Sequence, residues 1–300
     1  MPLPARLDAG LWGVLATPFR GSDLVIDEES LVRLVQDQMN SGAAGLVVLG
    51  VFGEGARLTT QEQLQVVKSV EREAGALPLV LGLAEHNTAD VVTKARRLVE
   101  AVRGTPSLMV QAPTANADQL TEHLTAVHEA TGAGIVLQDY PFASGVSISS
   151  QVILTVVAQC SFVVAVKSEA PPTSLAIAQL TAGTSTPVFG GLGGLGLLDE
   201  LMAGAAGAMT GFSHPAALRA TLSAWEIGGY ESARETYMPW MPLVNFEAQA
   251  AIGLAIRKTV MFERGLITEP TVRPPALSMP EALRPMLRKH MASLPARVNS

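Results

Sequence analysis

The stretch from Phe162 to Pro171, FVVAVKSEAP, begins as an apolar run and ends on charged residues. A short valine-rich run without polar alternation is typical of a strand covered on both faces, as in a parallel sheet. Side chains alternate along a strand, so Lys167 and Glu169 point to the same side. Two interpretations follow. The strand has reached the surface and its charges are solvated, or an amine and a carboxylate share one pocket.

Seven further apolar runs repeat this pattern along the chain. They are LWGVLATPF from Leu11, GLVVLG from Gly45, PLVLGLA from Pro78, PSLMVQA from Pro106, GIVLQDYP from Gly134, PVFGG from Pro187 and GAMTG from Gly207. Neighbouring runs begin roughly 20 to 35 residues apart, which is the spacing that a strand followed by a helix requires. Helical patterns fill the intervals, such as TTQEQLQVVKSVEREAG from Thr59, with a threonine cap and a terminal glycine. Eight such units predict an α/β fold, a (β/α)8 TIM barrel.

The alternation stops after the eighth run. From about Pro215 onward the chain has only helical patterns, and AWEIGGYESARETY contains a Gly-Gly break. We therefore expect a barrel catalytic domain over residues 1–224. A C-terminal helical bundle, joined without a flexible linker, is expected over residues 225–300.

Composition limits the possible partners and the compartment. The chain has 300 residues, 16% of them charged, with a net charge of −6, so no basic surface for nucleic acid is expected. No polybasic run, signal peptide or membrane-spanning segment is evident, which argues against a membrane location. The single cysteine, Cys160, excludes an internal disulfide and suits a reducing, cytoplasmic location. Its place at a helix-to-strand turn indicates a structural role rather than a nucleophile.

Lys167 is the one lysine of five that ends a predicted core strand. The others, Lys68, Lys94, Lys258 and Lys289, fall in predicted helices. Burying an ammonium group is costly, so the apolar context favours a functional lysine over a solvated strand end. A desolvated amine is a nucleophile for a carbonyl carbon. We therefore predict that Lys167 is catalytic.

Reaction at a carbonyl also needs groups that move protons and groups that bind the substrate. Glu169 lies on the same face as Lys167, and the run from Gly134 offers Gln138 and Tyr140 at the same two-residue spacing. The predicted catalytic residues are therefore Lys167, Glu169 and Tyr140. The predicted substrate-binding residues are Val51, Phe52 and Gly53 in the glycine-bounded turn GVFGEG, with Gln138, Gly191 and Gly193.

Several features suggest other functions less strongly. Gly191–Gly196 matches G-x-G-x-x-G, but it follows the seventh run rather than the first, so a dinucleotide site is not expected. No pair of histidines has metal-ligand spacing with a carboxylate companion, so no metal is expected. His86 is either a ligand contact or a solvated loop residue, and Glu54 is interpreted as a turn-capping carboxylate rather than a catalytic one.

Three motifs carry a family resemblance. GVFGE at residues 50–54, QDYP at residues 138–141 with Gly145, and Lys167 resemble the signatures of the dihydrodipicolinate synthase and N-acetylneuraminate lyase family. The resemblance spans essentially the whole chain. It implies a class I lyase that forms a Schiff base with a 2-oxo acid through Lys167, without a separate cofactor. It also implies a barrel with a helical C-terminal extension that assembles as a homotetramer or homodimer.

Departures from the family pattern bear on the reaction. Val51 and Phe52 stand where the family usually has two hydroxyl residues, and Gln138 stands where it usually has the catalytic tyrosine. Ala143 occupies the place of the synthase arginine, and nothing near residues 111–114 matches the tyrosine that a partner subunit contributes. Synthesis of the dihydrodipicolinate precursor is therefore not expected. Aldol condensation of pyruvate and a non-catalytic 2-oxo-acid-binding relative are the alternatives.

One branch of the family is more similar. The Gln-Asp-x-Pro turn, the Lys-x-Glu pair, AGAAGAMTGF from Ala203 and PLVNFE from Pro242 resemble the 2-keto-3-deoxy-L-arabonate dehydratase branch, although GVFGE does not. That resemblance gives imine formation to Lys167 and acid–base chemistry to Glu169. The implied reaction is dehydration, or retro-aldol cleavage, of a 2-keto-3-deoxy sugar acid.

Overall fold

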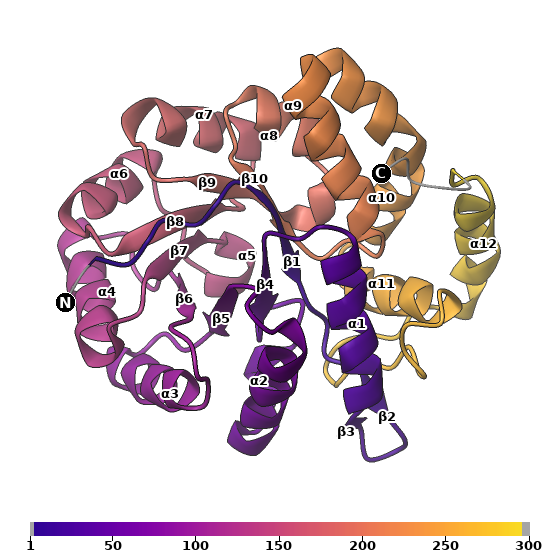
Figure 1. Ribbon diagram of the computed structural model, residues 1–300, viewed down its shortest axis with the longest axis horizontal. Coiled ribbons are helices and arrows are strands. Elements are labelled where there is room, and N and C mark those ends of the chain that lie inside the picture. The colour runs from indigo at the N-terminus through magenta and orange to yellow at the C-terminus, as the bar shows by residue number, and fades with distance from the viewer. Residues whose placement is uncertain (1–2, 296–300) are drawn as a thin grey trace.

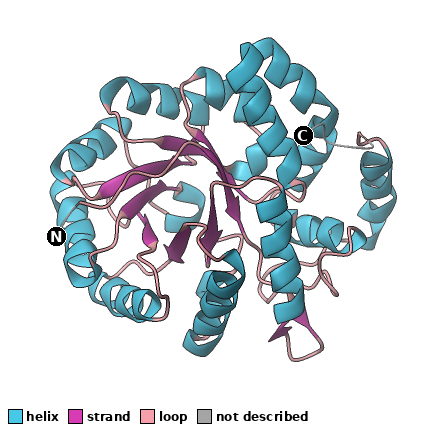
Figure 2. Cartoon of the chain, viewed as in Figure 1, coloured by secondary structure: helices cyan, strands magenta, loops and turns pink. Residues whose placement is uncertain are grey.

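Eight parallel strands close into a barrel in the computed structural model, which describes residues 3–295 (Figure 1 and Figure 2). Around the barrel the strand order is β1-β10-β9-β8-β7-β6-β5-β4, and each predicted run contains one of these strands. The strands are β1 (Gly10–Val14), β4 (Gly45–Val48), β5 (Leu79–Leu83), β6 (Ser107–Gln111), β7 (Ile135–Asp139), β8 (Val163–Ser168), β9 (Val188–Gly190) and β10 (Gly207–Thr210). The TIM-barrel prediction is confirmed.

Helices follow the strands and cover the outside of the barrel (Figure 2). They are α1 (Glu28–Asn40), α2 (Thr60–Ala74), α3 (Thr88–Glu100), α4 (Ala117–Thr131), α6 (Ser150–Gln159), α7 (Thr173–Gly183) and α8 (Leu197–Met202). A hairpin of β2 (Phe19–Arg20) and β3 (Val25–Ile26) precedes α1, and the short α5 (Pro141–Ser144) follows β7. Local chemistry fixes the ends of α2. Thr59 and Glu62 form a reciprocal capping box, and Gly75 with φ 61° ends the helix.

The C-terminal extension, α9 to α12, packs beside α1, α8 and β1 (Figure 1). It comprises α9 (Pro215–Tyr237), η3 (Met238–Trp240), α10 (Met241–Glu247), α11 (Gly253–Glu263), η4 (Glu281–Leu283) and α12 (Arg284–Ala292). The expected break falls at Gly229, whose φ of 63° and ψ of −151° are not helical. The boundary placed between 224 and 225 lies within α9, ahead of this break. The outer ends of the two expected domains, 1–2 and 296–300, lie outside the described residues.

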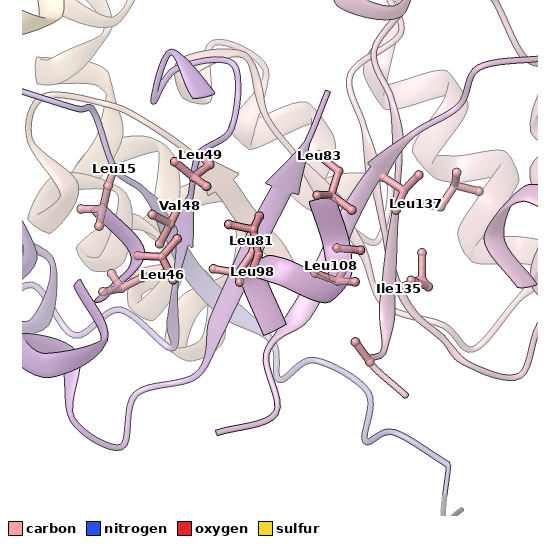
Figure 3. Close-up of a cluster of buried hydrophobic side chains, with 14 of the residues drawn as sticks. Leu15, Leu46, Val48, Leu49, Leu81, Leu83, Leu98, Leu108, Ile135 and Leu137 are labelled. Atoms are coloured by element: carbon pink, nitrogen blue, oxygen red, sulfur yellow. The ribbon is translucent and has the colours of Figure 1, made fainter. Parts of the chain in front are cut away.

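Two hydrophobic layers position the site. Side chains between strands and helices form the outer layer, where Ile135 and Leu137 lie near Leu108 and Leu81 (Figure 3). The inner layer fills the barrel and is made of Trp12, Val14, Val47, Val80, Met109, Val136, Val164, Ala165, Phe189 and Met209. Because side chains alternate along β7, Val136 points inward and Gln138 follows it on the inner face. The polar residues that end each run therefore lie at the carboxyl ends of the strands. We call this end of the barrel the barrel mouth.

Cys160 is buried and free, and it ends α6 just before β8, as expected for a structural residue. Within residues 3–295, no helix combines the length and apolar character needed to cross a membrane.

Candidate active site

Lys167 lies at the barrel mouth, near the end of β8. Its register partners are Gln138 on β7 and Phe189 on β9, and Phe189 belongs to the inner layer of the barrel. Lys167 is only 5% exposed, so the end of this strand is not a solvated surface. The amine is therefore inside the molecule, on the face where substrates of such barrels bind.

Glu169 pairs with this lysine. The distance from Lys167 Nζ to Glu169 Oε2 is 3.1 Å, and both side chains are buried. Gln138 Nε2 donates a hydrogen bond of 2.6 Å to the same oxygen, and the backbone N–H of Leu192 donates one of 3.3 Å to Oε1. A Cβ atom at Gly191 would lie 2.2 Å from Glu169 Oε1, so the absence of a side chain there makes room for the carboxylate. Gln138 and Gly191 thus hold Glu169 in place.

Tyr140 lies on the same side, one step nearer the rim. The ring is half-buried and tilted against Phe142, with 6.2 Å between the ring centroids. Burial raises the pKa of the Tyr140 phenol, the charge of Glu169 raises it further, and the charge of Arg257 lowers it. Within residues 3–295 the hydroxyl makes no hydrogen bond, so it is available to a ligand.

The turn after β4 divides into two parts with different surroundings. Val51 is 48% exposed and lines a hollow of about 280 Å³ together with Gly50, His86, Gln111 and Ala143. Lys167 is not among the residues that line this hollow. Val51 therefore faces a rim space beside the buried lysine–glutamate pair.

The Phe52 side chain points into the protein, and Gly53 is buried. The Phe52 ring packs against the inner layer and occupies the space beside Gly211, where a Cβ atom would lie 2.3 Å from it. The carbonyl of Gly53 accepts a 2.6 Å hydrogen bond from Thr17 Oγ1. Glu54, at φ 56°, accepts from Lys258 Nζ at 2.6 Å. Glu54 is thus held in a structural ion pair. Its side chain makes no capping hydrogen bond, so the turn-capping interpretation was wrong, and the carboxylate is instead used by Lys258 of the C-terminal extension.

Arg257, on α11, reaches the mouth and was not singled out by the sequence patterns. Its Nε donates a 3.3 Å hydrogen bond to Glu247 Oε2, and its guanidinium carbon lies 5.5 Å from the centre of the Phe52 ring. A Cβ atom at Gly193 would lie 2.1 Å from a terminal nitrogen of Arg257. The direction of the Arg257 side chain depends on how the C-terminal extension packs on the barrel. No local sequence motif predicts this packing.

Buried carboxyl groups surround the site. Burial, followed by the charge of Glu169, raises the pKa of Asp139 to about 6. Burial raises the pKa of Glu200 to about 7; a hydrogen bond from Thr173 opposes this, and the charge of Glu169 adds to it. Burial also raises the pKa of Glu247 to about 7, against the opposing effects of Arg257 and Ser213. Burial therefore shifts these three carboxyl groups towards the neutral form.

The described residues offer no group of three or more histidine, cysteine, aspartate or glutamate side chains that could hold a metal ion. Gly191–Gly196 forms η2 (Leu192–Gly194) and the entry to α8. Gly191 lies against Glu169, and Gly193 lies against Arg257. At the barrel mouth, Lys167 and Glu169 place an amine beside a fixed carboxylate. Such a pair can form an imine with a carbonyl compound and move protons at the neighbouring carbon.

Comparison with known proteins agrees with this geometry. A model described as "Dihydrodipicolinate synthetase family" matches residues 8–294. An L-2-keto-3-deoxyarabonate dehydratase from Azospirillum brasilense is 29% identical over 300 residues, covering 97% of this chain and 94% of that protein. A 4-hydroxy-tetrahydrodipicolinate synthase from Synechococcus sp. (strain CC9902) is 29% identical over 305 residues, covering 98% and 99%. The crystal structure of a dihydrodipicolinate synthase from Rhodopseudomonas palustris superposes with a TM-score of 0.89 at 28% identity, covering 98% of this chain and all of that one.

Proposed function

The chain belongs to the dihydrodipicolinate synthetase family of lyases, and we propose that it forms a Schiff base between Lys167 and a 2-oxo acid in order to dehydrate a 2-keto-3-deoxy sugar acid. The observation that carries this proposal is the buried pair of Lys167 and Glu169, 3.1 Å apart at the barrel mouth. The dehydratase from Azospirillum brasilense, similar over nearly the full length, supports the reaction type.

The proposed reaction starts at C2 of the substrate. The neutral amine of Lys167 attacks the carbonyl carbon, and loss of water from the carbinolamine gives a protonated imine. Glu169 removes a proton from C3, and the electrons of that bond form an enamine. Glu169 then returns this proton to the C4 hydroxyl, which leaves as water while the enamine electrons form the C3–C4 double bond of a conjugated imine. Water then hydrolyses the conjugated imine, which frees Lys167 and releases the dehydrated 2-oxo acid.

Glu169 suits the proton transfer because of where it is held. Gln138 and the N–H of Leu192 fix its carboxylate 3.1 Å from the amine, so it lies next to C3 of any carbonyl compound bound as the imine. Tyr140 is proposed as a second, weaker contributor, since its hydroxyl is free to contact a ligand. Gln138 has no proton to exchange near neutral pH, so the amide serves to position Glu169.

Retro-aldol cleavage and aldol condensation use the same imine. Similarity to the synthase from Synechococcus favours condensation as the second candidate, at the same identity as the dehydratase. Against it, Phe52 has no hydroxyl and is covered by Arg257, and Ala143 brings no charge to the rim hollow. Dehydration is therefore the preferred reaction. A non-catalytic 2-oxo-acid-binding relative is the remaining alternative.

Borohydride trapping tests the proposal. The protein is incubated with pyruvate, reduced with sodium borohydride and analysed by intact mass and peptide mapping. We expect one adduct per chain on the peptide that contains Lys167, and no adduct in Lys167→Met. The matched control Lys94→Met removes another buried lysine, paired with Glu85 at 2.9 Å, and should trap normally. Failure to trap any 2-oxo acid contradicts the proposal and favours the binding-only relative.

Product analysis then separates the reactions. With 2-keto-3-deoxy-L-arabonate and related sugar acids, dehydration lowers the product mass by one water, whereas retro-aldol cleavage releases pyruvate. If pyruvate is the main product, the reaction is retro-aldol cleavage rather than dehydration, and the proposed imine at Lys167 still stands.

We also propose that the chain assembles as a homotetramer or homodimer, as the family resemblance implies. Large apolar side chains on the surface support this, including Ile227 at 87% exposure and Phe142 at 78%. Light scattering at micromolar concentration should give the mass of two or four chains. A stable monomer would contradict this proposal.

A further inference from the structure

Arg257 and Glu169 lie against the same short loop at the barrel mouth. The loop after β9 has no side chain at Gly191, where the Glu169 carboxylate fits, and none at Gly193, where the Arg257 guanidinium fits. Two residues of chain span at most roughly 7 Å between Cα atoms. The N–H of Gly193 also donates a 2.7 Å hydrogen bond to Thr210 Oγ1, at the end of β10. Arg257 is therefore at the carboxyl end of the barrel, next to the lysine–glutamate pair.

The guanidinium group is held on two sides. Its Nε donates to Glu247, which is fully buried and is itself bound by the Ser213 N–H at 3.3 Å and by the Ser213 hydroxyl. Its guanidinium carbon lies over the Phe52 ring, 5.5 Å from the ring centre. A cation–π contact of this kind restrains the position of the guanidinium group. The direction of Arg257 is thus fixed before any ligand binds.

The two terminal nitrogens of Arg257 have no acceptor. Within residues 3–295 they donate no hydrogen bond, although the side chain is only 15% exposed. They are not among the fully buried polar atoms without a partner, so they remain open to solvent at the barrel mouth. A ligand that carries an acceptor at this point can bind them in place of water.

A 2-oxo acid carries such an acceptor. Its carboxylate is attached directly to the carbon that forms the imine, so it must lie within a few ångströms of Lys167. Lys167 is already paired with Glu169, and Val51 and Phe52 offer no hydroxyl. A guanidinium group presents two parallel N–H donors that match the two oxygens of a carboxylate.

We propose that Arg257 binds the C1 carboxylate of the 2-oxo acid and selects acids over neutral carbonyl compounds, with Phe52 as the support of the guanidinium group. This inference rests on the proposed function, because it assumes a 2-oxo acid bound at Lys167. It gives the C-terminal extension a direct part in the site. It also gives the aromatic residue in the turn after β4 a purpose that a hydroxyl residue could not serve.

Trapping with a charged and an uncharged ligand tests this role. The concentration that half-saturates borohydride trapping is measured for pyruvate and for its neutral methyl ester. Arg257→Met should raise the value for pyruvate about 10- to 100-fold, as expected when a charge-assisted hydrogen bond is lost, and leave the value for the ester nearly unchanged. Arg257→Lys, which keeps the charge but not the paired donors, should give a smaller increase. Arg284→Met, which removes an arginine from a surface pair with Glu281, should match the wild-type protein for both ligands.

The ester separates binding from folding. A variant that is merely damaged loses trapping of acid and ester alike, and equal losses would overturn the proposal, as would an unchanged value for pyruvate. If the wild-type protein traps no 2-oxo acid, the proposed function fails, and calorimetric titration of pyruvate into wild-type and Arg257→Met protein decides the inference separately. Heat of binding that is present in the first and absent in the second supports carboxylate binding at Arg257. Equal heats, or none in either protein, contradict it.

Discussion

Within residues 3–295, two lysine–glutamate pairs have both side chains buried, and they differ in how many partners they have. Lys167 and Glu169 lie at the barrel mouth, whereas Lys258 of α11 meets Glu54 beneath the C-terminal extension. Both lysines are nearly inaccessible, at 5% and 0% exposure. Burial and residue type therefore do not tell the two pairs apart.

In the pair beneath the extension, which we call saturated, both Lys258 and Glu54 have hydrogen-bond partners besides each other. Lys258 Nζ donates to Glu54 Oε1 at 2.6 Å and to the carbonyl of Thr271 at 2.8 Å, and it lies 4.4 Å from the centre of the Phe19 ring. The other oxygen of Glu54 accepts the N–H of Arg273 at 2.8 Å. Burial lowers the pKa of Lys258, and Glu54 opposes that shift. The pair joins the turn after β4 to the extension.

The pair at the mouth is left open on the lysine side. Glu169 has two hydrogen-bond donors besides the amine, but within residues 3–295 Lys167 has only its ion-pair partner. An amine with free hydrogen-bonding positions can contact and attack a ligand, whereas those of Lys258 are taken by Glu54 and Thr271. Free hydrogen-bonding positions at the barrel mouth, rather than burial, distinguish Lys167 from Lys258. Lys94 also has a single partner, Glu85, but it lies on α3, outside the barrel. Substitutions in the two pairs should therefore have opposite consequences.

The largest effect is expected at the open pair. Lys167→Met should lower turnover by about 10⁴-fold or more, because the covalent step loses its nucleophile. Unfolding in urea should change less than in Lys258→Met, because Gln138 and the N–H of Leu192 still bind the Glu169 carboxylate. Lys94→Met should keep its turnover. Substantial residual turnover in Lys167→Met would show that the amine of Lys167 does not carry the reaction.

The next effect concerns the saturated pair. Lys258→Met leaves Glu54 buried with only the N–H of Arg273 and the more distant Arg57, so we expect a loss of about 3–5 kcal/mol of unfolding free energy. Chemical denaturation measures it, with Lys68→Met, an exposed lysine of α2, as the control. Any folded fraction should still trap pyruvate at Lys167. Full stability together with lost trapping would reverse the roles that we assign to the two pairs.

A smaller effect is expected at the carboxylate of the open pair. Glu169→Gln should retain borohydride trapping at Lys167 and lose about 10²-fold in turnover, because the amide cannot move a proton. Tyr140→Phe should lose less. Turnover that depends on Tyr140 and not on Glu169 would move the proton-carrying role to the phenol.

Patterns that repeat along the chain made most of the fold predictable. Eight apolar runs with a constant interval leave few alternatives to a closed parallel barrel, and alternation along a strand places Lys167 and Glu169 on one face. The Gly-Gly break predicted the change of direction that the structure has at Gly229. These features depend on residues close together in sequence, which is why the sequence alone reveals them.

Contacts between distant segments were not predictable in the same way. Lys258 meets Glu54 across 204 positions, and Arg257 meets Phe52 across a similar interval. Gln138 was predicted as a substrate contact, and its bond to Glu169 could not be foreseen because it depends on the register between β7 and β8. Arg257 carried no signal within α11. Only the packing of the C-terminal extension on the barrel shows that Arg257 faces Gly193 at the barrel mouth.

Glu200 is a buried carboxyl group that has no cationic partner within residues 3–295. Glu200, on α8, accepts a 2.7 Å hydrogen bond from Thr173 at Oε1, and its buried Oε2 has no partner within residues 3–295. Burial raises the pKa of Glu200 to about 7, from 4.5 for the unperturbed group. The folded state therefore binds more protons than the unfolded state between these values. Stability should fall as the pH rises through that window and then stay constant.

Glu200→Gln should remove this dependence. At pH 8 the variant should be more stable than the wild-type protein by about 2–3 kcal/mol, since a shift of one pKa unit corresponds to about 1.4 kcal/mol, and at pH 5 the two should be nearly equal. Asp139 and Glu247 also make stability fall with rising pH, and they do so in both the wild-type protein and the variant. Comparing urea unfolding of the two proteins at both pH values therefore isolates the effect of Glu200. Asp199→Asn, at an exposed neighbour, should change stability little at either pH. A variant no more stable than wild type at pH 8 would mean that burial without a cationic partner does not raise the pKa of Glu200.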